Sequence, residues 1–123
     1  MCQIADPVDE AQPSFDWSLA LKRANQNVDA AKDILQQFVQ QLPGLVNSIE
    51  KANQTEDYEE MQAKVHQLHG ACCYTGVPVM LALCNDMEGA LKRKQIELAK
   101  LRVNRLKNES HNLLLAVRQA KII

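Results

Sequence analysis

This 123-residue sequence has few aromatic residues, almost no net charge and no long apolar run. Aromatic side chains make up 4% of the chain and apolar residues 46%, so any core is built mainly from aliphatic side chains. The formal net charge is −1, which provides no basic surface of the kind that nucleic acid requires. The most apolar stretch, near 77–84, is too short to cross a bilayer. We therefore expect a soluble domain without direct nucleic-acid or membrane contact.

Cysteine usage and the first residues argue against a secreted protein. Residues 1–13 have neither the basic start nor the apolar middle of a secretory signal. The four cysteines are Cys2, Cys72, Cys73 and Cys84, and the adjacent pair would diverge on a helix rather than bridge. Because this pattern implies no disulfide framework, we expect a reducing, cytoplasmic setting.

The chain divides into a short lead-in and one domain. Residues 1–14 are mostly polar or acidic, contain Pro7 and Pro13, and show no apolar period, so we interpret them as a flexible linker. Residues 15–123 are long enough for one domain with its own core and too short for two.

Apolar residues recur at three- and four-residue spacing through this domain, which predicts helices and no strands. Asp16 is a suitable N-cap for the first helix and Thr55 for the third. Pro43 indicates either a kink or the first turn of a new segment that continues to about residue 52. The predicted helices cover about 17–24, 28–41, 57–74, 78–93 and 95–120. Their short connections predict an all-α, up-down antiparallel four-helix bundle with an additional short N-terminal helix.

His66 is the most informative residue of the predicted helix over 57–74. At 3.6 residues per turn, it lies about 120° from the centre of the apolar stripe, and His69 lies about 60° from that centre. Gly70 shares the outer face with His66, although glycine inside a helix costs about 1 kcal/mol relative to alanine. A missing side chain at this position leaves clearance around an exposed imidazole.

The residues alone leave three interpretations of this face open. His66 can be an ordinary solvated side chain on a helical module that only binds other proteins. His66, His69 and Cys73 also lie on one side of the helix, where they could contribute to a zinc site that lacks a fourth ligand. Finally, His66 can be a nucleophile that a partner surface reaches. No glycine-rich phosphate loop, paired-carboxylate motif or Gly-x-Ser-x-Gly motif is present.

A resemblance favours the third interpretation. The segment that begins at Val65 reads Val-His-Gln-Leu-His-Gly-Ala-Cys-Cys-Tyr-Thr-Gly-Val-Pro and resembles the motif of the histidine phosphotransfer (HPt) domain, roughly Ala-His-x-Leu-Lys-Gly. It is most similar to the C-terminal HPt domain of hybrid sensor histidine kinases of the BarA/GacS type. The likeness extends over about 15–120 and includes the opening Asp16-Trp17-Ser18 and Leu83-Cys84 with Glu88.

The resemblance implies a four-helix bundle that carries a phosphoryl group on His66. Receiver domains would be the partners, one donating the group from its aspartate and a response regulator accepting it. The receiver would supply Mg²⁺, so we expect the chain to need no cofactor of its own. We expect the domain to be a monomer. Because it has no ATP site, we expect it to have no kinase activity of its own. The parent protein could be anchored in the inner membrane.

His69 stands where the motif usually has lysine, and Val79 where relatives often have arginine. We therefore expect less positive charge near the site, with His69 giving a supporting hydrogen bond or charge to the phosphoryl group. The expected docking surface lies beside His66 and consists of Gln62, Ala63, Gly70, Cys73 and Val77.

Overall fold

The computed structural model describes residues 12–123, so the expected linker over 1–14 lies largely outside the described residues. Five helices follow one another: α1 (Trp17–Arg23), α2 (Val28–Gln54), α3 (Tyr58–Cys72), α4 (Pro78–Lys92) and α5 (Ile96–Ala120). Residues 12–123 contain no strand, which confirms the predicted all-helical fold. None of the helices within this range combines the length and the hydropathy that a membrane span requires.

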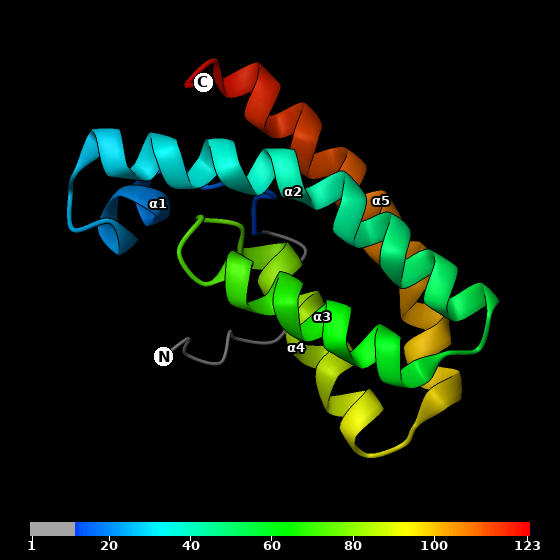
Figure 1. The fold of residues 1–123 in the computed structure, drawn as a ribbon. Helices are drawn as coiled ribbons and strands as arrows, with labels where there is room; N and C mark the ends of the chain where they lie inside the picture. The colour runs from blue at the N-terminus through cyan, green and yellow to red at the C-terminus, as the bar shows by residue number, and fades with distance from the viewer. Residues whose placement is uncertain (1–11) are drawn as a thin grey trace.

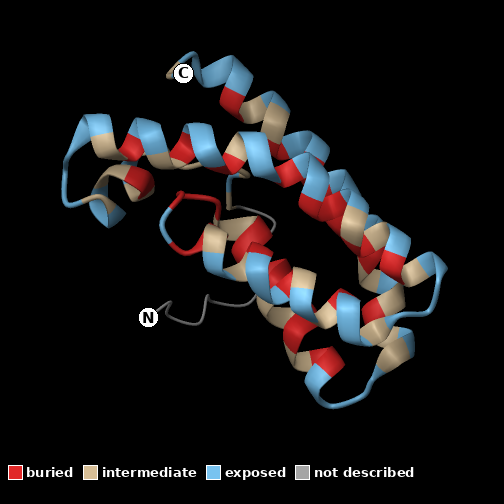
Figure 2. Ribbon diagram, in the orientation of Figure 1, coloured by how far each residue is buried: buried red, intermediate tan, exposed pale blue. Residues whose placement is uncertain are grey.

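The four long helices form an antiparallel bundle (Figure 1). α2 packs against α3 and α5, and α4 packs against the same two helices from the other side. Buried residues follow the inward faces of all four, as Figure 2 shows. The largest fully buried side chains are aliphatic or methionine, as the scarcity of aromatics predicts: Leu35, Leu42, Ile49, Met61, Leu68, Met80, Leu83, Met87, Leu106 and Leu113.

Side-chain caps define where three helices begin. Asp16 accepts a hydrogen bond from the backbone N–H of Leu19 at 3.1 Å, as predicted for α1. Asn27 gives the same type of cap to α2, and Asp57 gives it to α3. The prediction that Thr55 caps α3 is wrong: Thr55 ends α2, where its hydroxyl donates to the carbonyl of Lys51.

α2 continues through Pro43 without a break, so the prediction that the helix ends near Gln41 is wrong. Pro43 and Gly44 are both exposed, whereas Leu42 and Leu45 belong to the buried stripe. The missing N–H of proline therefore falls on the solvent side, where water can satisfy the freed carbonyl of Val39. Burial of the stripe on both sides of Pro43 keeps the helix continuous.

Gly76 fastens α1 to the turn between α3 and α4. Its φ is +79°, a conformation that favours glycine. A Cβ at this position would lie 2.6 Å from the carbonyl oxygen of Asp16 and 2.8 Å from the nitrogen of Ala20. The carbonyl of Gly76 also accepts a hydrogen bond from the N–H of Asp16 at 2.8 Å. The backbone at the start of α1 thus contacts the turn that follows the helix that carries His66.

We predict that Gly76→Ala lowers the free energy of unfolding by about 3 kcal/mol, because the new Cβ meets backbone atoms and the φ is unfavourable. Urea denaturation measures this change. Gly44→Ala is the matched control: a Cβ at Gly44 meets no atom within 4 Å, so that variant should be as stable as the wild type or more so. Equal stability of the two variants would contradict the role given to Gly76.

Candidate functional site

His66 projects from the outer face of α3. Its side chain is 74% exposed, as its position on the helical wheel predicts, whereas Val65 and Leu68 on either side are fully buried. The same helix therefore contributes to the core and presents an imidazole to solvent. A partner could reach the ring without any opening of the bundle.

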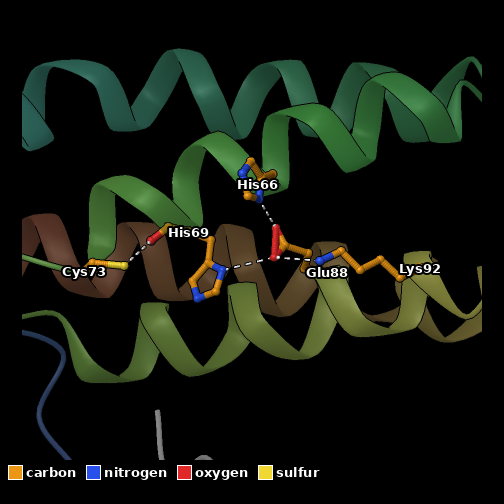
Figure 3. A network of polar contacts seen from close by, with 5 residues as sticks. All are labelled: His66, His69, Cys73, Glu88 and Lys92. Atoms are coloured by element: carbon orange, nitrogen blue, oxygen red, sulfur yellow. Dashed lines mark hydrogen bonds and ion pairs between the residues drawn. The ribbon is translucent and has the colours of Figure 1, made fainter. Parts of the chain in front are cut away.

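One ring nitrogen of His66 is occupied by a carboxylate from the neighbouring helix (Figure 3). Nδ1 lies 2.6 Å from Oε2 of Glu88 on α4. An ionised carboxylate only accepts hydrogen bonds, so Nδ1 must carry the proton and donate it. In a neutral imidazole the other nitrogen, Nε2, then bears the lone pair. The contact with Glu88 thus fixes both the orientation of the ring and its tautomer.

Glu88 is an acidic residue inside the bundle, only 7% exposed. Besides His66, it contacts Nδ1 of His69 at 3.3 Å and, more weakly, the Nζ of Lys92 at 3.7 Å. Burial raises the pKa of Glu88, but the hydrogen bonds and charge interactions with His66 and His69 together lower it by more, so the net pKa lies below its usual range. The carboxylate is therefore ionised at neutral pH.

His69 does not lie where the expected phosphoryl contact requires. Its side chain is only 14% exposed, because the ring turns inward toward Glu88. Nε2 is buried and has no hydrogen-bond partner among residues 12–123. With Nδ1 bound to Glu88 and Nε2 enclosed, His69 supports the carboxylate and does not face a group attached to the outer side of His66.

The expected docking surface is only partly exposed. Ala63 and Gly70 are exposed and Gln62 is half-buried, and a Cβ at Gly70 would meet no atom within 4 Å. Cys73 and Val77 are buried, so their expected exposure to a partner is wrong. α3 ends at Cys72 and the chain then turns into the interior, which explains both cases.

Beside Gly70, the surface continues toward α2 rather than toward the start of α4. A groove of about 230 Å³ lies between α2 and α3. Tyr74 contributes an exposed aromatic ring to this groove. The complete lining is Ile34, Gln37, Phe38, Gln41, Gly70, Ala71, Tyr74 and Thr75.

The zinc interpretation finds no support in residues 12–123, which contain no group of three or more His, Cys, Asp or Glu arranged to hold a metal ion. The sulfur of Cys73 lies 3.3 Å from the carbonyl oxygen of His69, away from the ring of His66. Cys72 and Cys84 are free thiols inside the bundle.

Glu88 and Lys92 are the site residues that our sequence reasoning did not select. A signal for Glu88 was present: it falls one turn after Cys84 and three residues before Leu91, on the apolar face of α4. An acidic residue on a buried face needs a partner, because an unpaired charge in the interior is costly. Lys92 follows one turn later, at the spacing of an ion pair along a helix.

We predict that Glu88→Gln and Glu109→Gln change stability in opposite directions at pH 7. Glu109 on α5 is also 7% exposed, but burial raises its pKa above the usual range despite hydrogen bonds that oppose this shift. Ionised Glu88 stabilises the fold, and ionised Glu109 destabilises it. At pH 7, Glu88→Gln should therefore lower the free energy of unfolding and Glu109→Gln raise it, each by an amount on the order of 1 kcal/mol.

Urea denaturation at several pH values checks the sign. The stability that Glu88 contributes is present above its unfolded pKa and is lost as the pH falls through its lower, folded pKa. The destabilisation by Glu109 disappears as the pH falls through its raised pKa and below its unfolded one. Both variants should approach the wild type in acid, and a difference that stays constant with pH would contradict this assignment.

Comparisons with known proteins agree with this architecture. Residues 33–120 match the Hpt domain family. The histidine-protein kinase BarA of Escherichia coli K12 is 39% identical over 79 residues, which are 64% of this chain and 9% of BarA. Sensor histidine kinase GacS of Pseudomonas protegens is 33% identical over 80 residues, or 65% of this chain and 9% of GacS. The match thus spans less than a tenth of these curated relatives.

A solved structure extends the likeness to the whole bundle. The HPT domain of a sensor hybrid histidine kinase from Shewanella superposes with a TM-score of 0.82 at 34% identity. The superposition covers 87% of this chain and 92% of that domain. The matched sequence and the shared helical bundle show that the chain belongs to the Hpt domain family.

Proposed function

We propose that this domain carries a phosphoryl group on Nε2 of His66 within a two-component phosphorelay. The observation that carries the proposal is the pairing of a 74% exposed imidazole with a buried carboxylate at Nδ1. A solvated histidine without a role needs no such partner. A phosphoryl carrier needs such a partner, because the attacking nitrogen must hold a lone pair that points outward.

The proposed reaction follows from this geometry. The phosphorylated aspartate of a receiver domain approaches the outer side of α3, and Nε2 attacks phosphorus in line with the leaving carboxylate oxygen. The bundle holds the ring still, so the domain contributes a positioned nucleophile and little else. We assign the Mg²⁺ that assists such transfers to the receiver, and we assign no cofactor to this chain. Transfer to a second receiver is the reverse of the same step.

The proposed docking surface surrounds His66 on two helices. Gln62, Ala63 and Gly70 contribute small or polar groups from α3, and the groove beside Tyr74 adds apolar surface shared with α2. Interfaces of this kind are small and transient, which suits a carrier that meets two receivers in succession. We propose that the domain acts as a monomer and that its parent is a hybrid sensor kinase, like the Shewanella protein whose HPT domain it resembles.

We predict that His66→Gln abolishes labelling by a phosphorylated receiver and leaves the fold unchanged, because the side chain is largely in solvent. Incubation with a radiolabelled receiver measures the transfer, and circular dichroism measures the fold. His111→Gln is the matched control, since His111 is an exposed histidine on α5. It should accept label at the wild-type rate. The label should be lost in acid and resist alkali, as phosphohistidine does and phosphoserine does not.

Retained labelling of His66→Gln would reject the proposal and favour a module that only binds proteins. Protein-bound label that survives acid would also reject it. The position of the phosphoryl group on the ring is a further check. We expect it on Nε2, and attachment to Nδ1 would contradict the proposal, because it requires that the contact with Glu88 be broken.

We predict that Gly70→Leu slows transfer from the receiver at least about tenfold without loss of stability. The new side chain has open space around it in the isolated domain. Leucine also has a higher helix propensity than glycine, by about 1 kcal/mol. It would obstruct only a docked partner. Gly44→Leu makes the same change on the exposed side of α2 and should leave transfer unaffected. If both variants transfer at the same rate, Gly70 is not part of the docking surface.

A further inference from the structure

We propose that Glu88 retains the proton on Nδ1 throughout the reaction and thereby makes phosphorylated His66 a good phosphoryl donor. This inference rests on the proposed function and concerns the second half of it, in which the group leaves His66. Glu88 is then a positioning residue that acts through the imidazole and does not touch phosphorus.

In the first half, the lone pair of Nε2 forms a bond to phosphorus while the bond from phosphorus to the aspartyl oxygen breaks. The electron pair of that bond returns to the aspartate as a carboxylate. The ring gains a positive charge, because Nε2 is now substituted and Nδ1 still carries its proton. The ionised carboxylate of Glu88, with Oε2 2.6 Å from Nδ1, lies where this charge develops.

In the second half, an aspartate oxygen of another receiver attacks phosphorus and the bond from phosphorus to Nε2 breaks. The electron pair returns to Nε2. If Nδ1 is protonated, the ring leaves as neutral imidazole with the proton where it began. If Nδ1 has lost its proton, the ring must leave as an imidazolide anion, which is a far poorer leaving group. The proton on Nδ1 therefore decides whether phosphorylated His66 can donate.

The surroundings of Glu88 suit this task. It is 7% exposed, so water competes little for its oxygens. Its neighbours are the two imidazoles of α3, His66 and His69, and the ammonium of Lys92 on its own helix. Within the described part of the chain, the ion pairs of α2 and α5 involve other acidic residues, Glu50, Asp86 and Glu97. His69 and Lys92 both contact Oε1, which leaves Oε2 to His66 alone.

A glutamine at this position would not do the same. Its amide can accept a hydrogen bond from a protonated Nδ1, but it can also rotate and donate one to an unprotonated Nδ1. The carboxylate can only accept, and it adds a negative charge that favours the cationic ring. Replacing Glu88 by glutamine preserves shape and removes this preference.

The experiment loads the wild type, Glu88→Gln and Glu109→Gln with phosphoramidate, a small-molecule phosphoryl donor, and measures the loss of phosphoryl to an unphosphorylated receiver against pH. Phosphorus NMR follows the phosphohistidine directly. At mildly alkaline pH, Glu88→Gln should donate at least about tenfold more slowly than the wild type. In acid the two rates should converge, because Nδ1 is then protonated in both proteins. Glu109→Gln, the same substitution at an equally buried site on α5, should follow the wild-type profile.

The outcomes separate this inference from the proposed function. A wild type that is loaded and donates, with a Glu88→Gln variant that has the same rate and pH profile, overturns the inference and leaves the carrier function intact. A rate lowered by the same factor at every pH also overturns it, because that result indicates a merely structural role. If phosphoramidate leaves no phosphohistidine at His66, both the inference and the proposed function fail. Nitrogen NMR of the unloaded proteins adds a direct test, since a wild-type His66 with its proton on Nε2 contradicts the inference.

Discussion

The contact between Glu88 and His66 joins α3 and α4, the two helices on which the proposed chemistry of this domain depends. A carboxylate in the interior must find hydrogen-bond donors, and α3 provides two imidazoles at the depth where α4 places the acidic side chain. The requirement acts in both directions. Packing of α3 on α4 holds Glu88 in place, and Glu88 in turn selects one orientation of a ring that would otherwise rotate freely in solvent. The exposed Nε2 has a fixed position because the other ring nitrogen, Nδ1, is bound to a buried carboxylate.

The sequence was sufficient for features that depend on one helix at a time. Apolar spacing located the helices, Asp16 was identified as a cap, and the helical wheel placed His66 outside and His69 at the boundary. Each of these follows from the local geometry of a regular helix. The effect of Pro43 depends on which face of the helix it occupies, which spacing alone does not show, and burial on either side keeps α2 continuous through it.

Features that depend on two helices were harder to predict. The wheel of α3 cannot show that Glu88 of α4 stands opposite His66 and His69, nor that the chain turns inward after Cys72 and buries Cys73 and Val77. These facts come from the register between helices, which no spacing within one helix encodes. The substitution of lysine by histidine at position 69 also has a different meaning in three dimensions. Instead of a weaker cation facing a partner, it gives the buried carboxylate a second donor, while Lys92 provides a cation from α4.

In the proposed function, the groove beside Gly70 separates the surface that recognises a partner from the group that reacts. Its exposed lining on α2 comes from residues such as Gln37 and Gln41, which lie outside the contacts that orient the imidazole. Substitutions there can alter the fit to one partner without disturbing the nucleophile or the aliphatic interior. If the domain carries phosphoryl groups as proposed, surface change on α2 alters which partner fits, and the position of the imidazole on α3 does not change with it.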